Sequence, residues 1–283
     1  MKTKEYILIG LLTAFLPVLL PLSGEGQTIS RNKKKTATTS TAKKQSGQSS
    51  RSSGTATKNL PAPIQQLISD MVSVKGGTFT MGATPEQGND ALDEEFPPHR
   101  VKVSSFSICK YEVTQAQWKA VMGNNPSHFK GDNLPVEQVS WEDCQTFIRK
   151  LNKLTGRKFR LPTEEEWEFA ARGGNLSRSS KFSGSNHLSN VAWYKENSGS
   201  KTHSVGSKSP NELGLYDMCG NVSEWCQNLF YDYKSSYKSE AGSPYRINRG
   251  GSWYDTPFFC RLSLRRLGHK AARTHDFGLR LAM

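Results

Sequence analysis

The sequence contains no CxxC motif, and no histidine stands at zinc-finger spacing from a pair of cysteines. Structural zinc sites use closely spaced ligands of these kinds, so the sequence disfavours a zinc-bound fold. In an oxidising compartment a disulfide is chemically possible, but the spacing leaves its pairing open. The five cysteines are Cys109, Cys144, Cys219, Cys226 and Cys260.

Negative charge is the minority sign, with 25 Asp and Glu against 38 Lys and Arg. Residues 1–60 hold ten Lys or Arg and two Asp or Glu, so they carry +8 of the total +13 and residues 61–283 carry +5. A basic patch is the electrostatic signature of a nucleic-acid partner. Because most of the excess belongs to the tail, we predict no nucleic-acid partner.

The first residues have the composition of an export signal. Two lysines precede an almost entirely apolar run over residues 6–22, and small residues follow it. Pro17 and Pro21 remove backbone donors and disfavour a spanning helix. We therefore predict a signal peptide over 1–26 and a periplasmic or secreted protein. A retained membrane anchor is the alternative.

Residues 27–63 are rich in Ser, Thr and Lys and offer little to bury. Such a composition cannot offset the loss of chain entropy, so this segment is predicted to be a disordered, basic linker. The folded domain is expected over 64–283. With the signal removed, we expect no stable membrane span.

Periodicity within the domain predicts mixed helix and strand. Residues 72–82 and 99–114 favour strands, the first with a bulge or turn at its glycine pair. Apolar residues over 141–154 recur at helical spacing, and Gly156 stands where a helix is expected to stop. Thr163 begins a capping-box pattern. We therefore predict an α+β domain with much irregular structure.

Four motifs then occur in a fixed order along the chain. They are RLPTEEEWEFAARGG (160–174), GLYDMCGNVSEWC (214–226), RGGSW (249–253) and FGLRLA (277–282). This series resembles the sulfatase-modifying-factor family, whose founder is the formylglycine-generating enzyme. The resemblance covers roughly Met71 to Met283. It implies a single C-type-lectin-like domain held partly by bound calcium.

The resemblance places two calcium sites. Calcium prefers oxygen ligands, and the carboxylates of Asp217 and Glu224 bracket a turn that offers the carbonyls of Gly220 and Val222. The alternative is that both carboxylates cap turns or pair with arginine. The other site implied by the family is weaker, because Asn197 replaces a frequent aspartate. Its residues are Asn190, Val191, Asn197 and Gly199.

The same resemblance questions the family's oxidase activity. The copper-dependent enzymes hold Cu(I) between two cysteines, whose positions here are Asp255 and Cys260. Soft Cu(I) selects thiolates, and a carboxylate is a hard ligand. Ser252 is retained, whereas Ser223 and Asp276 replace a tryptophan and an asparagine of the family's active site. Ser252 and Cys260 are therefore catalytic candidates only if the protein is active.

Aromatic and basic residues after the RGGSW turn suit a ligand cleft, although half of them could equally fill the core. The cleft candidates are Trp253, Tyr254, Phe258, Arg261 and Arg265.

Taken together, these features favour an exported, non-catalytic binding or scaffold module of the bacterial envelope, with structural calcium. Its expected partner is a protein, peptide or saccharide of the envelope. The alternative is a copper-dependent oxidase that makes formylglycine from a sulfatase cysteine. An iron-dependent sulfoxide synthase is disfavoured, because the six histidines are scattered and the chain has no room for the helical domain that such enzymes need.

Overall fold

The strands of the domain form three small sheets. The computed structural model describes residues 60–89, 91–234 and 242–283, so the predicted signal peptide and nearly all of the predicted linker lie outside the described residues. The strands are β1 (Met71–Val74), β2 (Gly77–Met81), β3 (His99–Val103), β4 (Phe106–Cys109), β5 (Ser223–Trp225), β6 (Tyr245–Arg249), β7 (Arg266–His269) and β8 (Phe277–Gly278).

Each predicted strand segment divides into two strands with different partners. β1 pairs with β4 and β2 pairs with β3, both antiparallel, so the chain turns at Lys75–Gly76 and again after Val103. A Cβ at Gly76 would lie 2.5 Å from the Val103 carbonyl, which explains why glycine stands at the first turn. The remaining sheet has the order β7-β6-β5-β8, in which β5 and β8 are parallel.

In the described residues, five helices and four short 3-10 turns complete the secondary structure. The helices are α1 (Ala62–Ser69), α2 (Gln115–Met122), α3 (Trp141–Thr155), α4 (Glu164–Ala171) and α5 (Leu188–Val191). The 3-10 turns are η1 (Pro85–Gln87), η2 (Asp93–Glu95), η3 (Gly174–Leu176) and η4 (Pro257–Cys260).

Local capping chemistry fixes the helix ends. The hydroxyls of Ser140 and Thr163 accept the third backbone amide of α3 and α4 in reciprocal capping boxes. Gly156 ends α3 in the left-handed conformation, as its position in the sequence predicted. α1 begins at Ala62, two residues before the predicted start of the domain.

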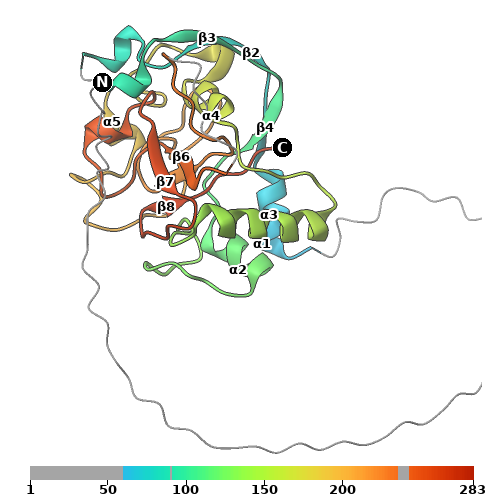
Figure 1. Ribbon diagram of the computed structural model, residues 1–283. Helices are drawn as coiled ribbons and strands as arrows, with labels where there is room; N and C mark the ends of the chain where they lie inside the picture. Colours follow the sequence, from blue (N-terminus) through green and yellow to red (C-terminus); the bar gives the residue numbers. More distant parts are fainter. Residues whose placement is uncertain (1–59, 90, 235–241) are drawn as a thin grey trace, which may run out of the picture. The chain divides into compact units, whose positions relative to one another are not determined.

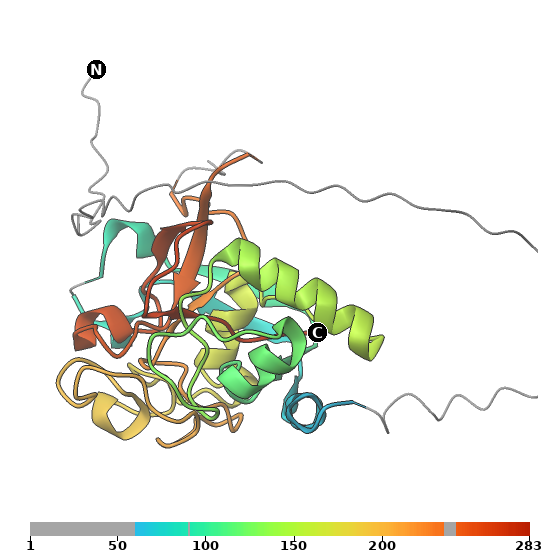
Figure 2. The same ribbon diagram turned by 90° about the horizontal axis from the view of Figure 1, so that it is seen from below.

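Three of the helices gather on one side of the domain. α2 contacts both α1 and α3, and α3 runs along that side in both views (Figures 1 and 2). α4 instead contacts β2, β3 and β6, so it lies between the N-terminal strands and the C-terminal sheet. No helix among the described residues is both long enough and apolar enough to cross a membrane.

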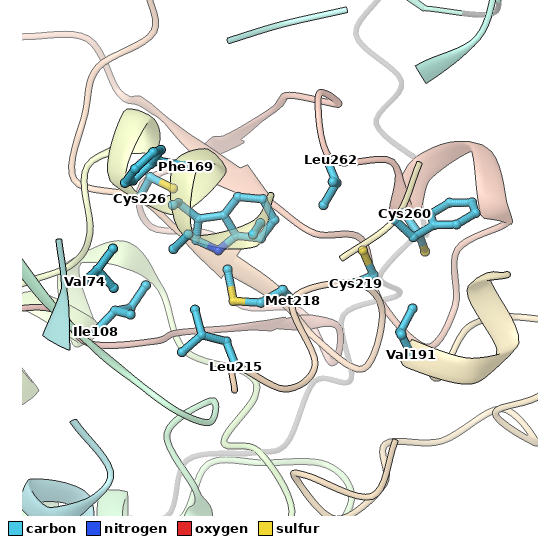
Figure 3. Packing of buried hydrophobic residues seen from close by; sticks show 14 of the residues in the cluster. Val74, Ile108, Phe169, Val191, Leu215, Met218, Cys219, Cys226, Cys260 and Leu262 are labelled. Atoms are coloured by element: carbon cyan, nitrogen blue, oxygen red, sulfur yellow. The ribbon is translucent and has the colours of Figure 1, made fainter. Parts of the chain in front are cut away.

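Two hydrophobic clusters form the core. One fills the space under α1, α2 and α3 around Trp118, Phe147 and Leu281. The other gathers the side chains of α4 with Met218, Cys219 and Cys260 from the loops (Figure 3). Residues 192–222, all of which are described, contain no helix or strand. The domain is therefore α+β with long irregular connections, as the sequence predicted.

Buried arginine–glutamate pairs join distant parts of the chain. Arg261 directly follows η4 and forms two hydrogen bonds with Glu95 of η2, at 2.9 and 2.7 Å. Both residues are at most 1% exposed. Arg265 binds Glu164 in the same forked manner, at 2.6 and 2.8 Å. Bidentate geometry satisfies both charged groups, which is the condition for burying them.

Arg261→Ala tests how much the domain depends on such a pair. The change leaves Glu95 charged and buried without its partner, so we expect the free energy of unfolding to fall by about 3–5 kcal/mol. Urea denaturation measures this loss. The control is Arg273→Ala, whose exposed pair with Asp143 should be worth about 1 kcal/mol or less. Equal, small losses in both variants would contradict a structural role for the buried pair.

Candidate functional site

The turn predicted to bind calcium lies inside the domain. Glu224 on β5 accepts a hydrogen bond from Trp167 Nε1 at 2.7 Å and from Arg280 Nη2 at 2.7 Å. All three residues are at most 1% exposed. The arginine partner that the sequence analysis held as an alternative is therefore present at Glu224.

Asp217 lies in the same turn, in the left-handed conformation with φ 56°. Its Oδ2 accepts the Gly206 amide at 2.7 Å, while Oδ1 is buried with no hydrogen-bond partner among the described residues. Burial raises the pKa of this carboxyl to about 6, against opposing contributions from the Gly206 hydrogen bond and Arg280. A buried carboxylate oxygen without a partner is costly unless a cation meets it.

The structure adds Glu112, which the sequence analysis missed. Its carboxylate accepts the Asn221 side-chain amide at 2.6 Å and the Val222 backbone amide at 3.0 Å. Burial, followed by the neighbouring charges of Asp217 and Glu224, raises its pKa well above the usual range. Glu112 is 105 residues before Asp217 in the chain, so only the fold could bring it here.

The oxygen ligands of this turn suit calcium in their chemistry. Three buried carboxyl groups, from Glu112, Asp217 and Glu224, lie near one buried guanidinium, from Arg280, and burial raises the pKa values of Glu112 and Asp217. Among the described residues, no group of three or more His, Cys, Asp or Glu is arranged to hold a metal by side chains alone. A cation would therefore also need backbone carbonyls, such as those of Gly220 and Val222, and hard oxygen ligands of both kinds suit calcium.

The weaker predicted calcium site is spread over α5 and the loop after it. Asn197 closes a local turn, since its Oδ1 accepts the Tyr194 amide at 2.8 Å and its Nδ2 donates to the Ala192 carbonyl at 3.0 Å. Asn190 is exposed at the end of α5, beside the buried Val191. Gly199 is exposed with φ 60°. Both hydrogen bonds of the Asn197 side chain are to backbone groups, and the four residues of this site contain no carboxylate, so the group has less to offer a cation.

Asp255, which the resemblance predicts to replace the first copper cysteine, is held in an ion pair. Its Oδ2 accepts the Ser252 hydroxyl at 2.7 Å and Arg266 Nη1 at 3.0 Å, and its Oδ1 meets Arg266 Nη2. The retained serine thus orients the carboxylate, and the arginine neutralises it. This set of ligands does not fit Cu(I), which selects thiolates.

The nearby thiols are buried and held in the protonated form. Burial raises the pKa of Cys260 well above its usual range, and the neighbouring Cys219 raises it further. Burial likewise raises the pKa of Cys219 to about 12. The two cysteines lie in the same part of the core (Figure 3). Since the thiolate is the reactive form, neither thiol has the environment of an activated cysteine.

The predicted ligand cleft needs correction. Arg261 and Arg265 are 1% and 6% exposed and are bound to Glu95 and Glu164, so they cannot present charges to a ligand. The sequence pattern suggested exposed arginines because charged residues usually face water. Phe258 is half-buried and packs under the Arg261 guanidinium. Tyr254, by contrast, is 52% exposed.

Tyr254 is exposed in a group of aromatic rings that includes residues outside the predicted cleft, and Trp253 is buried beneath them at 5% exposure. Trp253 contacts the ring of Phe129 edge-on, with 5.3 Å between the ring centroids. Its Nε1 donates a hydrogen bond to the His275 carbonyl at 2.9 Å. The exposed His128 packs against Phe129 at 4.8 Å. Phe129, His128 and His275 gave no periodic signal, because they stand in loops. We refer to these five residues as the aromatic surface.

Comparison with known proteins identifies the family. Residues 57–283 match the family model of the Sulfatase-modifying factor enzyme 1-like domain. The chain belongs to this family. A structure of Treponema denticola variable protein 1 aligns with a TM-score of 0.67 and 34% identity, over 75% of this chain and 94% of that one.

Two curated relatives carry different names. "Chaperone protein LppX" of Paenibacillus barcinonensis is 34% identical over 234 residues, which are 65% of this chain and 78% of the relative. "Formylglycine-generating enzyme" of Thermomonospora curvata is 27% identical over 290 residues, covering 74% of this chain and 89% of the relative. Family membership therefore establishes the C-type-lectin-like fold and leaves the activity to be argued from the site.

A buried carboxyl lies next to the aromatic surface of this family member. Glu137 Oε1 accepts the Phe129 amide at 2.8 Å, and Oε2 is buried without a hydrogen-bond partner among the described residues. Burial raises the pKa of Glu137 from 4.5 to about 7, although hydrogen bonds from Phe129 and His128 oppose the shift. The native state therefore favours the protonated form, which an amide can replace.

Glu137→Gln should change how stability depends on pH. Because its pKa is raised in the native state, Glu137 makes a contribution to the free energy of unfolding that is complete below pH 4.5 and is lost as the pH rises through 7. The variant lacks this loss, so its free energy of unfolding relative to wild type should rise by about 2–3 kcal/mol from pH 4 to 8. Urea denaturation across this range measures the difference. The exposed Glu142→Gln is the control, and parallel pH curves for Glu137→Gln and wild type would contradict the shift.

Proposed function

We propose that this protein is a non-catalytic binding or scaffold module that acts outside the cytoplasm, in the bacterial envelope. The observation that carries the proposal is the ion pair of Asp255 with Arg266. It occupies the position where the family's oxidases place a copper ligand, and Ser252 completes the arrangement. Export is inferred from the amino-terminal sequence, and the name of the chaperone LppX is consistent with a binding role.

The aromatic surface supplies the recognition side of this proposal. Tyr254 is exposed, while Trp253 is held by Phe129 and His275 and is only 5% exposed. Fixed aromatic rings beside exposed polar groups are effective contacts for peptides or saccharides, since little side-chain freedom is lost on binding.

A formylglycine-generating oxidase is the second candidate, because Cys219 could replace the missing cysteine. The Gly220 amide donates to the Gly250 carbonyl at 2.9 Å, and a Cβ at Gly251 would lie 2.9 Å from Cys260 Sγ. Cys219 and Cys260 therefore flank the same glycine turn. Their burial and raised pKa values oppose this rescue, since both thiols would have to lose protons to hold Cu(I).

Calcium is proposed as a structural ion held by Asp217, Glu224 and the backbone carbonyls of Gly220 and Val222, with the Glu112 carboxyl close by. The unpartnered Asp217 Oδ1 is the observation in its favour. The ion would neutralise carboxylate charge beside the 192–222 loop, where the backbone has few regular hydrogen bonds. We include Asn190, Val191, Asn197 and Gly199 as a second, weaker site.

Purified protein should not convert a sulfatase-type Cys-x-Pro-x-Arg peptide to the aldehyde when supplied with Cu(I) and oxygen. Mass spectrometry of the peptide gives the readout, with an active family member as the positive control. Asp255→Cys creates the second thiol and is expected to gain Cu(I) binding while leaving Arg266 unpaired. Turnover by the wild type that disappears in Cys260→Ser would contradict the non-catalytic proposal.

Calcium removal should lower the melting temperature of the domain. A ligand at 100 times its Kd stabilises the native state by about 2.7 kcal/mol, which for a domain of this size corresponds to about 5–10 °C. Asp217→Ala should abolish the response to chelator, and the exposed Asp132→Ala should keep it. A wild-type melting curve that is indifferent to both chelator and added calcium would rule out the site.

A further inference from the structure

A pocket of about 370 Å³ adjoins the aromatic surface. It opens between the loop after α2 and the segment around residue 202, which are joined by a hydrogen bond from the Val205 amide to the Asn133 carbonyl at 3.1 Å. Phe129 belongs to both the pocket and the aromatic surface. The residues that line the pocket include Phe129, Lys130, Leu134, Lys201, Thr202 and His203.

A buried hydroxyl in this pocket has no partner. Thr202 is 2% exposed, and its Oγ1 makes no hydrogen bond with any described residue. Ser198, four residues earlier, donates to the Trp253 carbonyl at 2.8 Å. Because a buried polar group without a partner carries a desolvation cost, a ligand that hydrogen-bonds Thr202 Oγ1 would recover that free energy.

The charges around the pocket are positive. Lys130 and Lys201 are exposed, and neither forms a salt bridge within the described part of the chain. Lys130 Nζ donates to the Asn125 carbonyl at 3.1 Å and lowers the pKa of Glu137 through its charge. Since burial raises the pKa of Glu137 to about 7, this carboxyl is only partly charged near neutral pH and neutralises these lysines only in part. Two ammonium groups beside one pocket favour an anion.

His203 has a fixed orientation at the pocket. Its ring stacks on that of Trp193, with 3.7 Å between the ring centroids, and its Nε2 lies 2.7 Å from the Ser198 carbonyl. A carbonyl can only accept, so Nε2 carries the hydrogen in this contact. Trp193 is itself held by a hydrogen bond from Nε1 to Ser207 Oγ at 2.7 Å. The ring of His203 is therefore held in one orientation beside the pocket.

From these observations we infer that the pocket binds an acidic sugar residue, with its carboxylate near Lys130 and Lys201 and a hydroxyl on Thr202 Oγ1. The inference rests on the proposed binding function and names its ligand class. A pocket of this volume is at the small end of ligand sites and suits one or two sugar rings better than an extended peptide. The side chains of Lys130, Lys201, Thr202 and His203 can all hydrogen-bond a sugar, whereas Phe129 offers an aromatic ring against which its C–H groups can pack.

Methyl β-D-glucuronide is the probe, and methyl β-D-glucoside is its uncharged control. We expect calorimetry or NMR titration of the full chain to detect binding of the glucuronide and much weaker binding of the glucoside. Thr202→Val removes one hydrogen bond while keeping the shape, so it should weaken glucuronide binding about three- to tenfold. Lys201→Gln should weaken it about two- to fivefold. The exposed Lys158→Gln should leave it unchanged.

Several outcomes would overturn the inference. Equal binding of glucoside and glucuronide would exclude recognition of the carboxylate, and equal competition by inorganic sulfate would reduce the site to a general anion site. Displacement of the glucuronide by a tetraglutamate peptide at lower concentration would favour an acidic peptide instead. Melting curves of Thr202→Val show whether a loss of binding reflects unfolding. No glucuronide binding, with no aldehyde formation, would remove this ligand and leave the non-catalytic proposal standing.

Discussion

Pairing of buried charge is the constraint on which the rest of this domain depends. Glu95, Glu164 and Glu168 belong to its first half, and each is buried against an arginine from residues 249–265. Removing one residue of such a pair leaves an uncompensated charge in the interior, which destabilises the fold far more than losing an exposed pair does. These contacts connect short sheets and long irregular loops that have few regular hydrogen bonds between them.

The same constraint explains the site where copper is expected in the family's oxidases. An aspartate at position 255 would be costly in the interior without a counter-charge, and Arg266 on β7 supplies one. Ser252 then donates to the carboxylate. The site is thus complete without a metal, and its polar groups satisfy one another. Around Asp217 the opposite holds, because one buried carboxylate oxygen has no hydrogen-bond partner among the described residues.

Local features of the fold could be predicted from the sequence. The capping box at Thr163, the end of α3 at Gly156 and the family motifs depend on neighbouring residues, and the structure confirms them. Contacts between distant residues could not be predicted. Glu112 reaches the Asp217 turn, and Arg261 reaches Glu95, only because the chain folds back on itself. A hydrophilic side chain also carries no local sign that it will be buried, so two arginines were wrongly assigned to the ligand cleft.

Titration of the folded protein with Cu(I) against a competing Cu(I) chelator tests the central claim most directly. The account predicts that the wild type retains no copper at a chelator concentration where a two-cysteine family member holds one equivalent, because Asp255 is bound to Arg266 and the nearby thiols are buried and protonated. Retention of one equivalent by the wild type, lost in both Cys219→Ser and Cys260→Ser, would contradict it.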